Sequence, residues 1–170
     1  MRPDTIIRKS SSWEGLFQRL TLILSLVFLT LPSIAMADVT GKPRVVDGDT
    51  IWIGETKIRL HGIDAPEMKQ TCIKGDEKYS CGQAATVALK EMLTDRDVKC
   101  QGKDVDRYGR IVAVCFVGEV DINASMVVLG WALAYRRYSM DYVDEEATAK
   151  ASRVGMWAGE FVEPWEWRRK

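Results

Sequence analysis

The sequence contains a single histidine among 170 residues, and none of its four cysteines forms a Cys-x-x-Cys pair. One histidine excludes catalytic mechanisms that need a pair of histidines, and His61 itself is expected to be a structural or surface residue. The lack of paired cysteines argues against a zinc site. There is also no internal repeat and no low-complexity segment.

An excess of positive charge is also missing, because 24 basic residues are matched by 24 acidic ones. Four of the basic and two of the acidic residues precede Asp38, so the rest of the chain is slightly acidic. Proteins that hold a polyanion by general attraction are normally basic. Such a ligand would therefore need a local patch and a metal ion. Arg136-Arg137 and Arg168-Arg169-Lys170 are candidate patches, although a solvated surface is the favoured interpretation of the terminal run.

Residues 1–37 have the pattern of a cleaved export signal. Four basic side chains precede an apolar run from Leu20 to Leu31, and Ala35-Met36-Ala37 supplies the small residues that a signal peptidase recognises. The run is shorter than the about 20 residues that cross a membrane, but an uncleaved anchor continuing to Ala37 is the alternative. We expect an exported protein, periplasmic or secreted, without stable membrane association after cleavage. Residues 38–170 are then long enough for a single domain, and nothing requires more than a monomer.

All four cysteines follow this segment, and an even number in an exported chain favours disulfides. Four cysteines allow three pairings. We favour Cys72 with Cys81, which closes a loop after an acidic turn, and Cys100 with Cys115, which flank a predicted hairpin. The alternative is two or more free thiols.

Apolar patterning predicts an α+β fold. Strands are predicted at 42–46, 50–53, 57–60, 97–100 and 110–117. Helices are predicted at 83–93, at 121–129 before Gly130, and at 142–153 before Gly155. This order fits a small antiparallel barrel that carries helices. The aromatic tail from Glu160 is expected to pack on the barrel, with rings exposed for stacking as the alternative.

Two segments, 46–50 (Val-Asp-Gly-Asp-Thr) and 58–67 (Ile-Arg-Leu-His-Gly-Ile-Asp-Ala-Pro-Glu), place one arginine among several acids. The carboxylates of Asp49 and Asp64 are hard oxygen ligands of the kind that calcium or magnesium accepts. Glu67 follows a proline-stiffened turn and can lie close to such an ion. Arg59 carries a planar guanidinium suited to phosphate oxygens. Each segment alone is more typical of an ordinary turn, but together they indicate a metal-assisted phosphoryl-transfer site.

A third segment, Asp106-Arg107-Tyr108-Gly109-Arg110, completes a resemblance. In order and spacing, the three segments resemble the staphylococcal-nuclease-like (thermonuclease) family, and the likeness runs from about Lys42 to Trp157. The resemblance implies a five-stranded OB-fold barrel with about three helices. It also implies a calcium-dependent endonuclease that hydrolyses phosphodiester bonds of DNA and/or RNA.

The resemblance further implies a role for individual residues. Asp49 and Asp64 would bind calcium with the help of the Ala65 carbonyl. Glu67 would position or deprotonate the attacking water as general base. Arg59 and Arg110 would bind the phosphate and stabilise the transition state. The implied contacts to the nucleotide are Arg107, which replaces a lysine common in the family, Tyr108, and Tyr138 or Tyr135.

A binding module without chemistry is the main alternative. Relatives of this family are known that have lost the catalytic acids, and OB-fold barrels of this kind bind nucleic acid or protein. The acids and both arginines are retained here, which favours the enzyme. A calcium-stabilised surface protein is a third interpretation.

Overall fold

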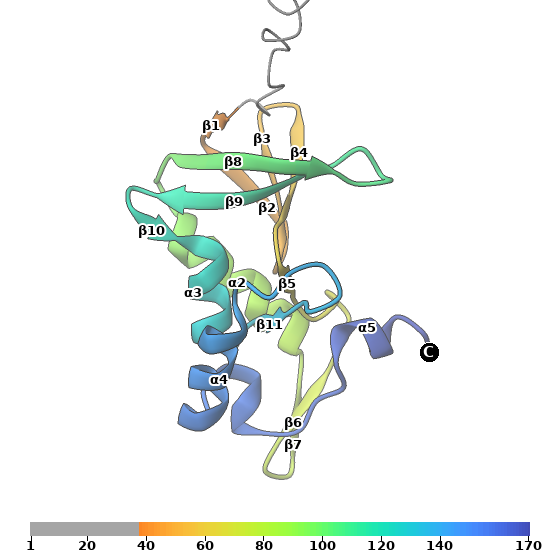
Figure 1. The fold of residues 1–170 in the computed structure, drawn as a ribbon. Coiled ribbons are helices and arrows are strands. Elements are labelled where there is room, and N and C mark those ends of the chain that lie inside the picture. The colour runs from red at the N-terminus through yellow and green to blue at the C-terminus, as the bar shows by residue number, and fades with distance from the viewer. Residues whose placement is uncertain (1–37) are drawn as a thin grey trace, which may run out of the picture. The chain divides into compact units, whose positions relative to one another are not determined.

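The structure is a computed structural model that describes residues 38–170 (Figure 1). The predicted export signal and the alternative membrane anchor fall on residues 1–37 and lie outside the described residues. Among the helices of residues 38–170, none combines the length and the apolar character needed to cross a membrane.

The predicted α+β class is confirmed. The strands are β1 (Val39–Gly41), β2 (Pro43–Asp47), β3 (Thr50–Ile53), β4 (Thr56–Leu60), β5 (Ile63–Asp64), β6 (Cys72–Lys74), β7 (Glu77–Tyr79), β8 (Val98–Val105), β9 (Ile111–Val117), β10 (Val120–Asp121) and β11 (Leu133–Ala134). The helices are α2 (Cys81–Leu93), α3 (Ile122–Val128), α4 (Val143–Ser152) and α5 (Pro164–Trp167), with a 3-10 turn at Gly155–Ala158. All five predicted strands and all three predicted helices are present within these elements.

The main sheet has the order β1-β8-β9-β4-β3-β2, and β10 pairs with β9. Neighbouring strands are antiparallel except β4 and β9, which are parallel because the chain passes through α2 and β8 between them. The sheet is consistent with the expected OB-fold class, but it is not closed, since β1 and β2 form its two ends. Figure 1 shows α2, α3 and α4 below the strands of the main sheet, with the β6–β7 hairpin at the bottom of the view.

The core lies between this sheet and the helices. Ile51 and Ile58 are fully buried on the paired strands β3 and β4, and Leu89 of α2 and Met126 of α3 pack into the same cluster. The Asp121 carboxylate caps α3 by accepting a hydrogen bond from the Ala124 amide at 2.9 Å. The strands next to the acidic segments are therefore packed against the hydrophobic core, which holds them in place.

Both expected disulfides are present. Cys72 joins Cys81, which links β6 to the first residue of α2, and Cys100 joins Cys115 across the paired strands β8 and β9. No free cysteine remains among the described residues.

The aromatic tail packs onto the domain, as predicted. Phe161 and Trp165 lie against a second apolar cluster that contains the Cys72–Cys81 disulfide. Trp165 stacks on Tyr135 with ring centroids 5.5 Å apart and planes 4° from parallel. The tail is therefore part of the fold and ends beside the acidic segments.

Candidate active site

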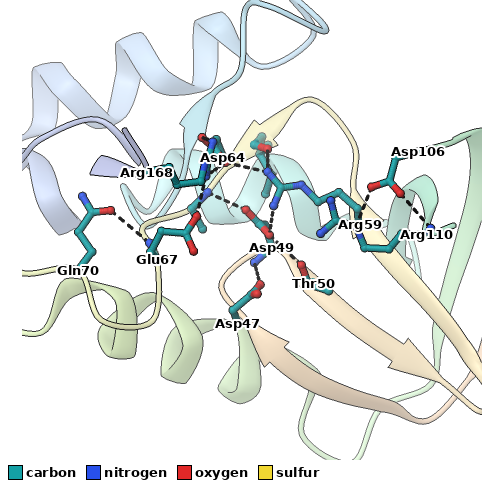
Figure 2. A network of polar contacts seen from close by, with 12 residues as sticks. Asp47, Asp49, Thr50, Arg59, Asp64, Glu67, Gln70, Asp106, Arg110 and Arg168 are labelled. Atoms are coloured by element: carbon teal, nitrogen blue, oxygen red, sulfur yellow. Dashed lines mark hydrogen bonds and ion pairs between the residues drawn. The ribbon is translucent and has the colours of Figure 1, made fainter. Parts of the chain in front are cut away.

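Arg59 joins two buried carboxylates. Its guanidinium pairs with Asp49 Oδ1 through one terminal nitrogen and with Asp64 Oδ1, at 2.7 Å, through the other (Figure 2). The side chains of Asp49 and Asp64 are 4% and 0% exposed. Two acids that the sequence places 15 positions apart thus converge within the width of one guanidinium. This predicted grouping of Asp49, Asp64 and Arg59 is present in the structure.

Strand pairing explains this convergence. Thr50 lies opposite Arg59 in the antiparallel β3–β4 pair, and the Leu60 amide donates to the Asp49 carbonyl at 2.8 Å. Gly62 then turns the chain with a φ of +72°, which favours glycine, and Asp64 follows in β5. The Ala65 amide donates to Asp49 Oδ2 at 2.9 Å and so ties the second segment to the first.

The pKa values indicate a surplus of negative charge. Burial, followed by the neighbouring Asp49 carboxylate, raises the pKa of Asp47 to about 6. Burial also raises the pKa of Asp64, while hydrogen bonds from Arg168 act in the opposite direction. Burial would lower the pKa of the Arg59 guanidinium, but Asp49 and Asp64 outweigh this effect and raise it. Buried, crowded carboxylates are the surroundings in which a bound cation is favourable.

Glu67 stands at the solvent edge of this pair. Its side chain is 42% exposed, so water reaches it. The turn that carries it is fixed by Gln70, which is fully buried, accepts from the Glu67 amide at 3.2 Å and donates to the Val162 carbonyl at 2.6 Å. A side chain at Gly82 would meet the Glu67 carbonyl at 1.8 Å, so the start of α2 packs directly against this turn.

Arg168 is a residue of the site that the sequence did not reveal. One terminal nitrogen donates to Asp64 Oδ2 at 2.7 Å, and the other donates to Asp64 Oδ1 at 3.1 Å and to Glu67 Oε1 at 2.7 Å (Figure 2). The terminal run is exposed, as expected, but the Arg168 guanidinium also pairs with Asp64 and Glu67, which the sequence did not predict. Burial would lower the pKa of Arg168, but the hydrogen bonds to Asp64 and Glu67 prevail and raise it.

Arg110, the second predicted arginine, is held outside this pair of acids. Its Nε donates to Asp106 Oδ2 at 2.7 Å, and its amide donates to Asp106 Oδ1 at 3.0 Å. Burial alone would raise the pKa of Asp106, but the hydrogen bonds from Arg110 outweigh it and lower the pKa. In the part of the chain that the structure describes, no ion pair joins Arg110 to Asp49, Asp64 or Glu67. Arg110 immediately precedes β9, the parallel neighbour of the strand that carries Arg59.

The predicted nucleotide contacts are exposed. Tyr108 and Tyr138 are 71% and 66% exposed, and the Arg107 guanidinium lies 5.1 Å from the centre of the Tyr108 ring. Tyr135, the alternative to Tyr138, is instead stacked against Trp165. His61 Nε2 donates to Asp141 Oδ2 at 2.9 Å, a contact that fits the expected structural role.

Within residues 38–170, no three acidic, histidine or cysteine side chains form a ready metal cage. The reason is visible in Figure 2, where arginines lie between the carboxylates. The chemistry of the donors nevertheless fits a hard divalent cation, because Asp49 and Asp64 supply buried carboxylate oxygens that lie close together, with Glu67 at their open edge.

Comparisons with known proteins place this architecture in a family. The sequence profile described as "Staphylococcal nuclease homologue" matches residues 57–159. The chain is similar to Protein ParB of Escherichia coli, with 35% identity over 86% of this chain and 88% of that protein. It is 33% identical to a micrococcal nuclease of Shigella flexneri, over 88% of this chain and 92% of the relative. An uncharacterized endonuclease of Haemophilus influenzae is 34% identical, over 75% of this chain and 71% of that protein.

The chain therefore belongs to the staphylococcal nuclease homologue family, and by class it is a nuclease. The resemblance inferred from the three segments is confirmed. Residues 160–170, which include Arg168, lie beyond the matched region.

Proposed function

We propose that this protein is an exported, calcium-dependent endonuclease that hydrolyses phosphodiester bonds of DNA and/or RNA. The observation that carries the proposal is the bridge from Arg59 to both buried carboxylates, with Glu67 at the open edge. A phosphate that approaches this edge meets a guanidinium, a cation-binding pair and an acid that can handle water.

Asp49 and Asp64, with the Ala65 carbonyl, would hold the calcium ion. This assignment is supported by the convergence of the two carboxylates and by the Ala65 amide, which donates to Asp49 Oδ2 and so keeps Ala65 beside the pair. When bound, the cation would polarise a phosphate oxygen as a Lewis acid.

The other residues would act either on the attacking water or on the phosphate and its nucleotide. Glu67, partly exposed and fixed through its turn by Gln70, would take the proton of the attacking water. Arg59 and Arg110 would neutralise charge that builds on the phosphate oxygens. Arg107, Tyr108 and Tyr138 would contact the nucleotide, for which the exposure of both tyrosines provides support.

Export is supported by the cysteines. Disulfides persist in oxidising compartments and are rare in the cytosol, and the structure pairs all four cysteines. A periplasmic or secreted monomer is consistent with this chemistry.

Replacing Glu67 with glutamine is expected to lower the cleavage rate about a hundredfold, by comparison with other single groups that stabilise a transition state. Glutamine keeps the size of the side chain but cannot accept the water's proton. Binding of an oligonucleotide should be retained. Cleavage kinetics and fluorescence anisotropy of single-stranded DNA measure the two effects.

Glu55→Gln, which removes the same charge from an exposed turn between β3 and β4, is the matched control and should cleave at the unaltered rate. A Glu67→Gln variant that cleaves as fast as this control would rule out Glu67 as the general base. If the unaltered protein and the Glu67→Gln variant both bind DNA and neither cleaves it, the inert binding module is the better description.

A further inference from the structure

Arg168 holds the one oxygen of the carboxylate pair that, among the described residues, neither Arg59 nor the backbone contacts. Asp49 Oδ1 accepts from Arg59 and from the Thr50 hydroxyl, and Asp49 Oδ2 accepts from the Ala65 amide. Asp64 Oδ1 accepts from Arg59. Among the described residues, Asp64 Oδ2 is left free by Arg59 and by the backbone, and Arg168 donates to it at 2.7 Å.

The same guanidinium also occupies Glu67. Its contact to Glu67 Oε1 is 2.7 Å, so a single planar cation spans the proposed metal ligand and the proposed base (Figure 2). The two hydrogen bonds that Arg168 donates to the oxygens of Asp64 make a bidentate pair, which is among the stronger charge-assisted contacts in proteins.

Charge balance indicates competition with a divalent ion. Asp49, Asp64 and Glu67, which we call the acidic cluster, carry three negative charges, and Arg59 supplies one positive charge. At least two negative charges remain, and the neighbouring Asp47 adds to them. Arg168 neutralises one of these charges and therefore reduces the attraction for a divalent cation.

The tail delivers Arg168 to this position. Glu160 and Ile73 exchange backbone hydrogen bonds of 2.8 Å, and the Val162 carbonyl accepts from Gln70. Pro164 is buried, and Trp165 stacks on Tyr135. These contacts fix the chain up to α5, whereas the Arg168 side chain is 37% exposed and can swing outward without moving the helix.

We propose that Arg168 is an internal counter-ion of the acidic cluster that competes with the divalent cation for Asp64 and Glu67. In the cation-free protein its guanidinium stabilises the crowded carboxylates. Binding of the cation requires this side chain to withdraw into solvent, so Arg168 sets the cation concentration at which the site fills. This inference rests on the proposed function for the place of the cation, and it adds a residue from outside the matched region.

The test is calorimetric titration of the purified protein with calcium chloride, without substrate. Arg168→Gln should bind calcium about tenfold more tightly than the unaltered protein, since loss of one charge-assisted contact to the competitor is worth roughly a factor of ten. Arg168→Lys keeps the positive charge but loses the planar guanidinium, so its calcium affinity should lie between those of Arg168→Gln and the unaltered protein. Arg169→Gln removes the same charge one residue later, where the only acid that pairs with the guanidinium among residues 38–170 is Glu166, and should bind as the unaltered protein does.

Thermal unfolding provides a second readout. Without calcium, Arg168→Gln should melt below the unaltered protein, and calcium should raise its melting temperature by a larger increment. Equal or weaker calcium binding by Arg168→Gln, or equal tightening by Arg169→Gln, would overturn the competition while leaving the proposed function intact. Absence of calcium binding in all four proteins would overturn the cation site itself and the competition with it.

Discussion

Replacing Arg59 with alanine is expected to lower the free energy of unfolding by about 3–5 kcal/mol, the usual cost of removing one partner from a buried ion pair. Asp49 and Asp64 are 4% and 0% exposed, so each would keep a buried charge without its bridge. Cleavage should fall at least about a hundredfold, because the proposed role of this guanidinium is to stabilise charge on the phosphate. Urea denaturation and cleavage kinetics measure the two effects.

Arg110→Ala is the matched comparison. Its partner Asp106 is 19% exposed, and pairs that water reaches contribute about 0–1 kcal/mol. We therefore expect a similar loss of cleavage with little loss of stability. If Arg59→Ala unfolds at the same urea concentration as Arg110→Ala, Arg59 is not the element that holds the acids together.

Reduction of both disulfides is expected to lower the free energy of unfolding by roughly 5 kcal/mol. The cross-links close loops with sequence separations of 15 and 9, and loop-closure entropy assigns them about 3 and about 2.5 kcal/mol. Domains of this size are stable by only about 5–15 kcal/mol. Thermal unfolding with and without a reductant checks this expectation.

Two double variants separate the contributions. Cys100/Cys115→Ala removes the cross-link between β8 and β9, and we expect it to lower stability more than activity. Cys72/Cys81→Ala frees the segment that anchors the tail through Ile73, so activity should also change. Melting temperatures that do not respond to reductant would contradict a structural role for either bridge.

The larger elements were predictable because their signals are local. In β4, the buried Ile58 and Leu60 flank the less buried Arg59, and α3 begins at a capping aspartate and ends before a glycine. Strands of two or three residues, such as β5, β6 and β11, are too short to show a period. β6 pairs with the neighbouring β7 in a short hairpin, whereas β5 and β11 pair with each other from distant parts of the chain, which one sequence does not display.

In the site, too, residues within local segments were predictable from the sequence and a residue from a distant segment was not. Asp49, Arg59, Asp64 and Glu67 lie within two segments whose turn and strand chemistry indicates their proximity. Arg168 lies 104 positions from Asp64 and belongs to a run of three basic residues that is typical of solvated tails. The signal that could have found it is the preceding aromatic segment, because a tail that buries Pro164 and stacks Trp165 on the domain keeps the residues that follow close to the domain surface.

We propose that the carboxylate pair, Glu67 and the arginines form one cation-dependent phosphodiesterase site. The decisive experiment is incubation of the purified protein with single-stranded DNA, first in calcium and then in calcium with an excess of chelator. We expect cleavage in calcium and its loss with the chelator. No cleavage in calcium, or equal cleavage under both conditions, would contradict the claim.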